Sequence, residues 1–325
     1  MKYEKGNYGD WSEILYKAKI IYDNWIIDTS NTIHNIVESK IDDKTIRNNG
    51  SVISVNNIMI LNKEEALNII IKGAQELKLS SGRSFYCPSL RLFFTKLGIS
   101  KIKSSSECKN DMIVEFDDIG KRSLTFKSNG RSRPAWINAS KPTNFRYKII
   151  GGYGSNLNTK NLIKDIYNKG GYVEFDCVPD HRFSDNIGSS INAIAMINLE
   201  YYKSVGCSVD ALIDSLFLNK DRVCDLSKQV FIREVKEFLL NFSCDYTPTK
   251  KLSDSKISSG GLVWMSKTGD MVCDITTNKR DFRDLIYRTA EMDTGSTKRH
   301  AFGSPFILNG SHYILLNLSV REGKE

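Results

Sequence analysis

The sequence predicts a fold that mixes helices and strands, of the α/β or α+β class, with a mixed central sheet and helices on its faces. In several segments apolar residues recur at helical spacing, whereas in others they alternate strictly with polar residues, as in half-buried strands. Of the 325 residues, 40% are apolar and 26% are charged, as in an ordinary folded protein with a sizeable core. No obvious linker cuts the chain into independent domains.

Helices are expected over several segments. The first, residues 10–26, has Asp10 as a possible N-cap and Glu13 three residues later, which fits a capping box. The other helices are expected over residues 62–80, 89–98, 158–171 and 279–292, with three more between 189 and 242. Hairpins are expected over residues 110–128, 260–275 and 306–320, and a short strand over 172–175. Asn309-Gly310 marks the turn of the last hairpin.

The hairpin over residues 110–128 determines which polar residues meet. Residues 118–120 fit a three-residue loop with Gly120 in the left-handed conformation. That loop predicts Glu115 opposite Ser123 and Asp111 opposite Lys127. The Cβ atoms of directly opposed residues lie about 5 Å apart, so a carboxylate and an ammonium group would sit side by side.

An Asp and a Lys on neighbouring strands are typical of metal-dependent phosphodiesterases. Asp111 would bind a hard cation such as Mg²⁺ through oxygen, and Lys127 would orient the attacking water and offset negative charge. The competing interpretation is a cross-strand salt bridge that contributes a few tenths of a kcal/mol.

The charge balance favours a polyanionic partner. Lys and Arg number 46 against 38 Asp and Glu, which gives a net charge of +8. Nucleic acid is the first expectation and an acidic membrane surface the second. Two segments without acids support nucleic acid, because their side chains suit phosphates and base edges. The candidate DNA contacts are Arg131, Arg133, Asn138, Ser140, Lys141 and Asn144 in one segment, and Ser296, Thr297, Lys298, Arg299 and His300 in the other.

Other classes of site and of location are disfavoured. The seven cysteines form no Cys-x-x-Cys pair and there are only four histidines, so no zinc site is expected. The N-terminus has no apolar signal region, and no apolar run reaches about 18 residues. We therefore expect a soluble cytoplasmic protein with reduced thiols and no membrane partner.

Several strings in the sequence resemble one known family. They are "KGNYGDWSEILYKAK", "DMIV", "LTFKS", "INASKPTNF", "FLLNFSCDYTPT", "SGGLVWMSKTGDMVCD", "MDTGSTKRHAFG" and "LLNLSVRE". Together they are similar to the HpaII-type family of type II restriction endonucleases, nearly from end to end. This resemblance implies a double-strand DNA endonuclease with a PD-(D/E)xK-like core, a requirement for Mg²⁺ and the palindromic site CCGG. It also implies a cognate DNA methyltransferase as functional partner, and a palindromic site favours a two-fold homodimer.

The resemblance also assigns roles to residues. Asp111 corresponds to the metal-binding acid and Lys127 to the catalytic lysine. Thr125 stands where the usual second acid would be, so the second metal ligand must come from elsewhere. Three candidates remain open: the Phe126 carbonyl, Glu115, and Glu13 on the first helix, which equally fits a capping residue facing the Asp10 amide.

The arginines of "NGRSRPAW" are a departure from the family pattern. They would either change which bases are read or strengthen phosphate contacts. We treat residues 1–325 as a single nuclease chain, with the catalytic core and N-terminal helices in about 1–150 and a helical and hairpin region for DNA recognition in 151–325. Two alternatives remain: a non-catalytic DNA-binding protein, and a structure-directed DNA repair nuclease.

Overall fold

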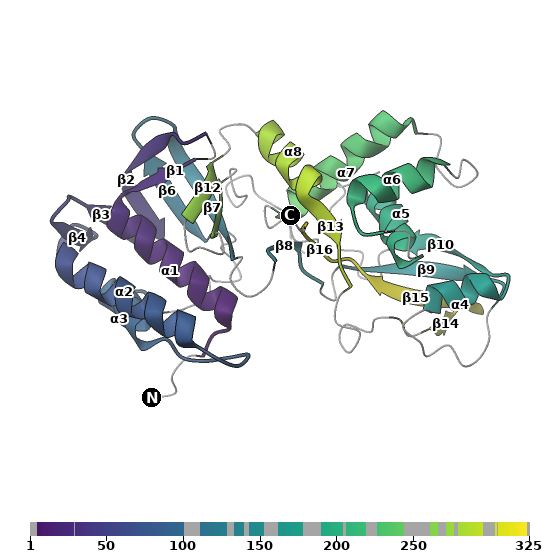
Figure 1. The fold of residues 1–325 in the computed structure, drawn as a ribbon, viewed down its shortest axis with the longest axis horizontal. Coiled ribbons are helices and arrows are strands. Elements are labelled where there is room, and N and C mark those ends of the chain that lie inside the picture. Colours follow the sequence, from purple (N-terminus) through teal and green to yellow (C-terminus); the bar gives the residue numbers. More distant parts are fainter. Residues whose placement is uncertain are drawn as a thin grey trace. The chain divides into compact units, whose positions relative to one another are not determined.

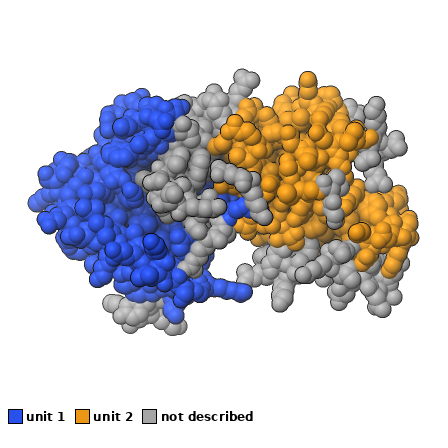
Figure 2. Space-filling model, viewed as in Figure 1, with its two compact units in different colours: residues 1–134, 252–282 blue, residues 135–251, 283–325 orange. Residues whose placement is uncertain are grey.

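The computed structural model describes most of the chain as two compact units. The described residues are 5–28, 30–100, 111–128, 133–139, 143–152, 162–177, 190–203, 206–218, 226–243, 261–265, 271–275, 279–294, 303 and 305–323. Unit 1 comprises Met1–Pro134 and Leu252–Phe282, and unit 2 comprises Ala135–Lys251 and Arg283–Glu325 (Figure 2). The expected division near residue 150 placed residues 260–275 with the C-terminal region, whereas in the structure this hairpin belongs to unit 1.

Unit 1 is built on a nine-stranded sheet with the order β12-β11-β7-β6-β2-β3-β4-β5, with β1 paired to β2 (Figure 1). Its strands are β1 Trp25–Ile27, β2 Ile33–Ile41, β3 Lys44–Asn48, β4 Val52–Val55, β5 Ile58–Asn62, β6 Met112–Phe116, β7 Gly120–Ser128, β11 Gly261–Met265 and β12 Met271–Ile275. The β11–β7 pair is parallel, whereas β7–β6 and β6–β2 are antiparallel. The prediction of a mixed α and β fold is therefore confirmed.

Three helices accompany this sheet: α1 Tyr8–Asp23, α2 Lys63–Leu79 and α3 Pro88–Lys96. Helix α1 contacts β7 as well as α2 and α3, so it lies between the other helices and the sheet (Figure 1). Trp11, Tyr16 and Phe93 are fully buried, together with Val114 and Leu124 from the sheet. Burial of large side chains of this kind contributes roughly 1.5–3 kcal/mol each. The packing of α1 therefore fixes its position relative to β6 and β7.

The first helix begins earlier than the sequence pattern suggested. Asn7 is the N-cap: its side-chain oxygen accepts from the Asp10 amide at 3.0 Å, and the Asp10 carboxylate accepts from the Asn7 amide at 2.8 Å. The prediction of Asp10 as N-cap was wrong, because Asp10 is the third residue of the helix, the N3 position of this capping box. Glu13 consequently lies in the second turn and has no capping role.

The β6–β7 hairpin is confirmed, but its register differs from the prediction. Phe116 pairs with Gly120 and Glu115 with Lys121, so the loop consists of residues 117–119. The loop has the predicted length but begins one residue earlier, which moves the partner of each β6 residue by two positions. Gly120 keeps its left-handed conformation (φ 69°) as the first residue of β7.

Unit 2 contains two smaller sheets and most of the remaining helices. The four-stranded sheet has the order β10-β9-β15-β14, and the three-stranded sheet the order β13-β16-β8. The strands are β8 Ala135–Ile137, β9 Asn144–Ile150, β10 Tyr172–Cys177, β13 Ala290–Met292, β14 Phe306–Leu308, β15 Ser311–Asn317 and β16 Val320–Glu322. The helices are α4 Leu162–Asn168, α5 Ser190–Tyr202, α6 Val209–Leu218, α7 Lys228–Ser243 and α8 Lys279–Thr289, the last of which begins in unit 1. Within the described residues, no helix combines the length and the apolar character needed to cross a bilayer.

Candidate active site

Helix α1 presents an acid and a lysine on one face. Glu13 and Lys17 are four residues apart, which places them one helical turn from each other. The Lys17 ammonium nitrogen lies 2.5 Å from Glu13 Oε1. Lys17 is only 3% exposed, although a lysine is rarely buried without a partner. The lysine of this pair is therefore inside unit 1, whereas the Glu13 side chain is partly exposed.

Asp111 lies immediately before β6 and is held against β7 by two hydrogen bonds. Its amide donates to the Leu124 carbonyl at 3.1 Å, and its carboxylate accepts from the Phe126 amide at 2.9 Å. An amide that donates to a carboxylate forms a charge-assisted bond, which is stronger than a neutral one. The Asp111 carboxylate is therefore fixed where β6 begins.

Glu13 and Asp111 lie next to each other. Burial and then the negative charge of Asp111 raise the pKa of Glu13 to about 7, while the ammonium group of Lys17 acts in the opposite direction. A side-chain hydrogen bond between the two carboxyl groups contributes to the same increase in pKa. Two acids almost 100 positions apart in the sequence thus form a close pair in unit 1.

The Phe126 side chain connects this pair to the helix. Its ring stacks on Tyr16, with the centroids 6.1 Å apart, and the Lys17 ammonium lies 5.8 Å from its centroid. The same residue donates its amide to Asp111. The sequence offered Phe126 as a metal ligand through its carbonyl, whereas the contact that the structure gives is through its amide.

Thr125 and Lys127 follow on β7. Continuing the β6–β7 register by one residue places Asp111 opposite Thr125, which is 3% exposed. The prediction that Asp111 lies directly opposite Lys127 was wrong, because the loop begins one residue earlier. Lys127 lies two residues, or about 7 Å, further along β7, a diagonal distance that a long side chain can span. Lys127 is partly exposed and pairs in the sheet with Trp264 of β11.

Four more of the predicted site residues are described by the structure: Glu115, Arg133, Asn138 and Asn144. Glu115 lies opposite Lys121 and Glu38, four residues or about 13 Å along β6 from Asp111. Arg133 is partly buried in unit 1 and Asn138 is exposed in unit 2, whereas Asn144 is 2% exposed in β9. Arg131, Ser140, Lys141, Ser296, Thr297, Lys298, Arg299 and His300 lie outside the described residues.

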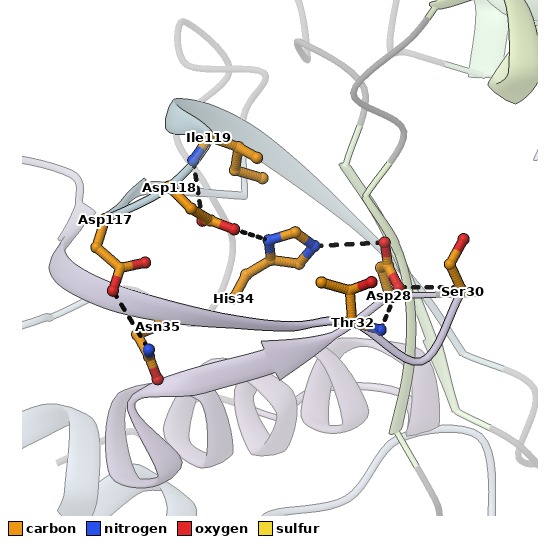
Figure 3. Close-up of polar contacts among 8 residues, drawn as sticks. All are labelled: Asp28, Ser30, Thr32, His34, Asn35, Asp117, Asp118 and Ile119. Carbon is orange, nitrogen blue, oxygen red and sulfur yellow. Dashed lines mark hydrogen bonds and ion pairs between the residues drawn. The ribbon is translucent and has the colours of Figure 1, made fainter.

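A second polar cluster supports the hairpin that carries this site (Figure 3). His34 on β2 is 4% exposed and lies between two carboxylates: its Nδ1 is 2.6 Å from Asp118 Oδ2, and its Nε2 is 3.3 Å from Asp28 Oδ2. Asp118 is in the β6–β7 loop and Asp28 follows β1, so the cluster ties the tip of the hairpin to the β1–β2 connection. Sequence patterns gave no indication of this cluster, because Asp118 is 84 residues from His34 in the chain.

Within unit 1 this geometry offers oxygen ligands to a hard cation. Among the described residues no group of three or more His, Cys, Asp or Glu side chains could hold a metal ion, so the described part of the site provides the two carboxylates of Glu13 and Asp111. Mg²⁺ is commonly bound by one or two carboxylates, with water and phosphate oxygens as the other ligands. Two partly buried, mutually repelling carboxylates are the kind of site that such a cation stabilises.

Comparison with known proteins identifies the family. The family described as HpaII restriction endonuclease matches residues 7–322. The chain belongs to this family. The type II restriction enzyme HpaII of Haemophilus parainfluenzae is similar to it, with 27% identity over 356 aligned positions that cover 97% of this chain and 98% of that enzyme. No solved structure matches the chain.

Membership of the HpaII family agrees with the resemblance seen in the sequence. It shows a restriction endonuclease, a class of enzyme that hydrolyses DNA at specific sites. It does not by itself assign roles to Glu13, Asp111 or Lys127.

Proposed function

We propose that this HpaII-family restriction endonuclease hydrolyses phosphodiester bonds of double-stranded DNA with Mg²⁺ bound by Asp111 and Glu13. The observation that carries the proposal is the close pair formed by these two carboxyl groups at the start of β6. Such a pair is costly in a partly buried site unless protons or a cation neutralise it. A divalent cation would neutralise both groups.

Four residues of unit 1 would share the chemistry. Asp111 and Glu13 would bind the cation, which when bound would stabilise charge on the phosphoryl oxygens and favour ionisation of the attacking water. Lys127, partly exposed at the end of β7, would orient that water and offset negative charge in the transition state. Thr125 supplies a hydroxyl and no charge, so the acid that usually occupies this position would be replaced by Glu13 of α1.

This arrangement supports a PD-(D/E)xK-like core. Such a core has three main elements: an acid before one strand, a lysine on the antiparallel neighbouring strand, and a helix packed against that second strand. In unit 1 these are Asp111 before β6, Lys127 on β7, and α1. In the motif the second acid and the lysine are separated by one residue. Thr125 and Lys127 have this spacing, with Thr125 at the position of the acid. We therefore infer that β6, β7 and α1 form the catalytic part of the chain.

DNA would be the partner, read as a short palindrome. We propose the site CCGG on the resemblance to the HpaII-type family. A palindrome favours a two-fold homodimer, in which each copy cuts one strand. The segments 131–141 and 296–300 would contact the DNA, whereas Asn144 is buried in β9 and is not proposed as a contact. A cognate methyltransferase would protect the host sequence.

Digestion of plasmid DNA tests this function. The protein is incubated with plasmid in Mg²⁺ or in EDTA, and the ends of the products are sequenced. We expect discrete fragments with one terminal sequence in Mg²⁺, intact plasmid in EDTA, and no cleavage by the Asp111→Asn variant. Asp117→Asn, at the exposed tip of the same hairpin, is the matched control and should cleave normally. A metal-dependent smear would indicate a repair nuclease, and intact plasmid under all conditions would indicate a non-catalytic DNA-binding protein.

A further inference from the structure

The buried lysine of α1 has no role in the chemistry described above. Lys17 is 3% exposed. Its ammonium nitrogen lies 2.5 Å from Glu13 Oε1 and 5.8 Å from the centroid of the Phe126 ring. Burial removes a lysine from water, which is unfavourable unless an opposite charge lies beside it. Glu13 is that opposite charge, and Glu13 is also one of the two carboxylates proposed to bind the cation.

The positions of the three charges have a direct electrostatic consequence. Two ionised carboxylates contribute a charge of −2 to this part of unit 1. The buried Lys17 offsets one of these charges at Glu13, and the partly exposed Lys127 is a separate positive charge on β7. The ammonium is attached one turn away from Glu13 on the same rigid helix, so it remains beside Glu13 whenever α1 is folded. A divalent cation that binds Glu13 must therefore do so next to a resident positive charge.

We propose that Lys17 is a positioning residue of the metal site, the resident counter-ion of the Glu13–Asp111 pair. It holds Glu13 in place in the free enzyme and lowers the affinity of that enzyme for divalent cations. This inference rests on the proposed function, because it takes Glu13 and Asp111 as the cation ligands. DNA would raise the affinity for the cation by adding phosphate charge and phosphate oxygens, which would offset the unfavourable effect of Lys17.

The expected effect follows from Coulomb's law. A unit positive charge about 5 Å from a divalent cation opposes its binding by roughly tenfold or more, even with the screening of bulk water. Removing that charge should tighten cation binding by about the same factor when DNA is absent. A change that keeps the charge should leave the affinity nearly unaltered.

Calorimetric titration of the whole protein with Ca²⁺, without DNA and at pH 8.5, measures this effect. Lys17→Met and Lys17→Gln should bind Ca²⁺ about tenfold more tightly than the wild type, and Lys17→Arg should stay within about threefold of it. Thermal unfolding of each variant shows whether it is folded. A lysine that only stabilises the fold would lower the unfolding temperature and leave the Ca²⁺ affinity unchanged, which would overturn the inference.

Two further measurements keep the outcomes separate. Asp111→Asn should weaken Ca²⁺ binding at least about tenfold. If Asp111→Asn binds Ca²⁺ as tightly as the wild type, the proposed metal site itself is refuted. If Asp111→Asn binds more weakly but Lys17→Met binds as the wild type does, only the role of Lys17 is refuted. If both neutral variants fail to fold, the ion pair is neutralised as a whole: Glu13→Gln combined with Lys17→Met should bind Ca²⁺ about tenfold more tightly than Glu13→Gln alone. Equal affinity of these two proteins would contradict the inference.

Discussion

Replacing Asp111 by Asn should stabilise the metal-free protein at alkaline pH even though it abolishes cleavage. The pKa of Glu13 rises from 4.5 to about 7, a change that corresponds to roughly 3 kcal/mol against the ionised form. Burial is the larger cause and the charge of Asp111 the second. Since the Glu13 side chain is also 24% exposed, we assign about 1 kcal/mol to the repulsion by Asp111. The asparagine side chain of the variant would keep an oxygen that accepts from the Phe126 amide, so that hydrogen bond should survive.

The sign of this effect depends on pH. Because the folded pKa of Glu13 lies above its unfolded value, its contribution to stability is fully present below about pH 4.5 and is lost as the pH rises through about 7. At pH 8.5 both carboxylates of the wild type are ionised and repel each other, and Asp111→Asn removes this repulsion. At pH 5 Glu13 is protonated, so the same substitution gains nothing.

Differential scanning calorimetry in EDTA measures the difference. We expect the unfolding temperature of Asp111→Asn to exceed that of the wild type by about 2–4 °C at pH 8.5, and by nothing at pH 5. Asp117→Asn should show no such dependence on pH. A lower unfolding temperature at pH 8.5, or the same shift at both pH values, would mean that the two carboxylates do not repel each other as described.

Three other changes test the site and its support. Lys127→Ala should slow plasmid cleavage by at least about 100-fold while the DNA affinity measured in Ca²⁺ by gel mobility shift stays within about threefold; a parallel loss of both would argue against a catalytic role. Glu13→Gln should raise the Mg²⁺ concentration for half-maximal cleavage at least about tenfold. In the wild type, cleavage in limiting Mg²⁺ should fall as the pH drops below about 7, because protons then compete with the cation for Glu13. His34→Ala should lower the free energy of unfolding by about 1–3 kcal/mol in urea titrations, since two carboxylates lose their shared partner; an unchanged midpoint would exclude a stabilising role.

Periodic patterns were sufficient to predict much of the fold. Helices α2 and α3 follow apolar repeats; Asn62 caps α2 through its side chain, and α3 begins at Pro88 without a side-chain cap. The last hairpin turns at Asn309-Gly310, where both residues have positive φ (48° and 75°). Such local signals need no knowledge of distant residues. They also locate the β6–β7 hairpin. Its predicted loop was one residue too late in the sequence, and this error alone changed the predicted partner of every β6 residue.

The strands between residues 25 and 62 were not predicted, and β2 shows why. Its buried residues include His34 and Ile36, then Ser39 and Ile41, so the alternation changes phase by one residue. The change coincides with a bulge in the pairing with β6 between Ile36 and Glu38. Two of the four buried side chains are polar, and His34 is buried because Asp28 and Asp118 lie beside it. A search for alternating apolar residues misses such a strand.

The candidate site depends on contacts that no local pattern contains. The sequence alone left Glu13 as either a capping residue or a cation ligand, and Asn7 removes the first alternative by capping α1 with Asp10. Packing then brings Glu13 to Asp111: Tyr16 stacks on the Phe126 ring, and the Phe126 amide holds the Asp111 carboxylate. Phe126 of β7 thus contacts both the helix and the acid. In the metal-free protein a third carboxylate at position 125 would add to the repulsion between Glu13 and Asp111, which Lys17 offsets only in part, so an uncharged residue such as Thr125 suits this position.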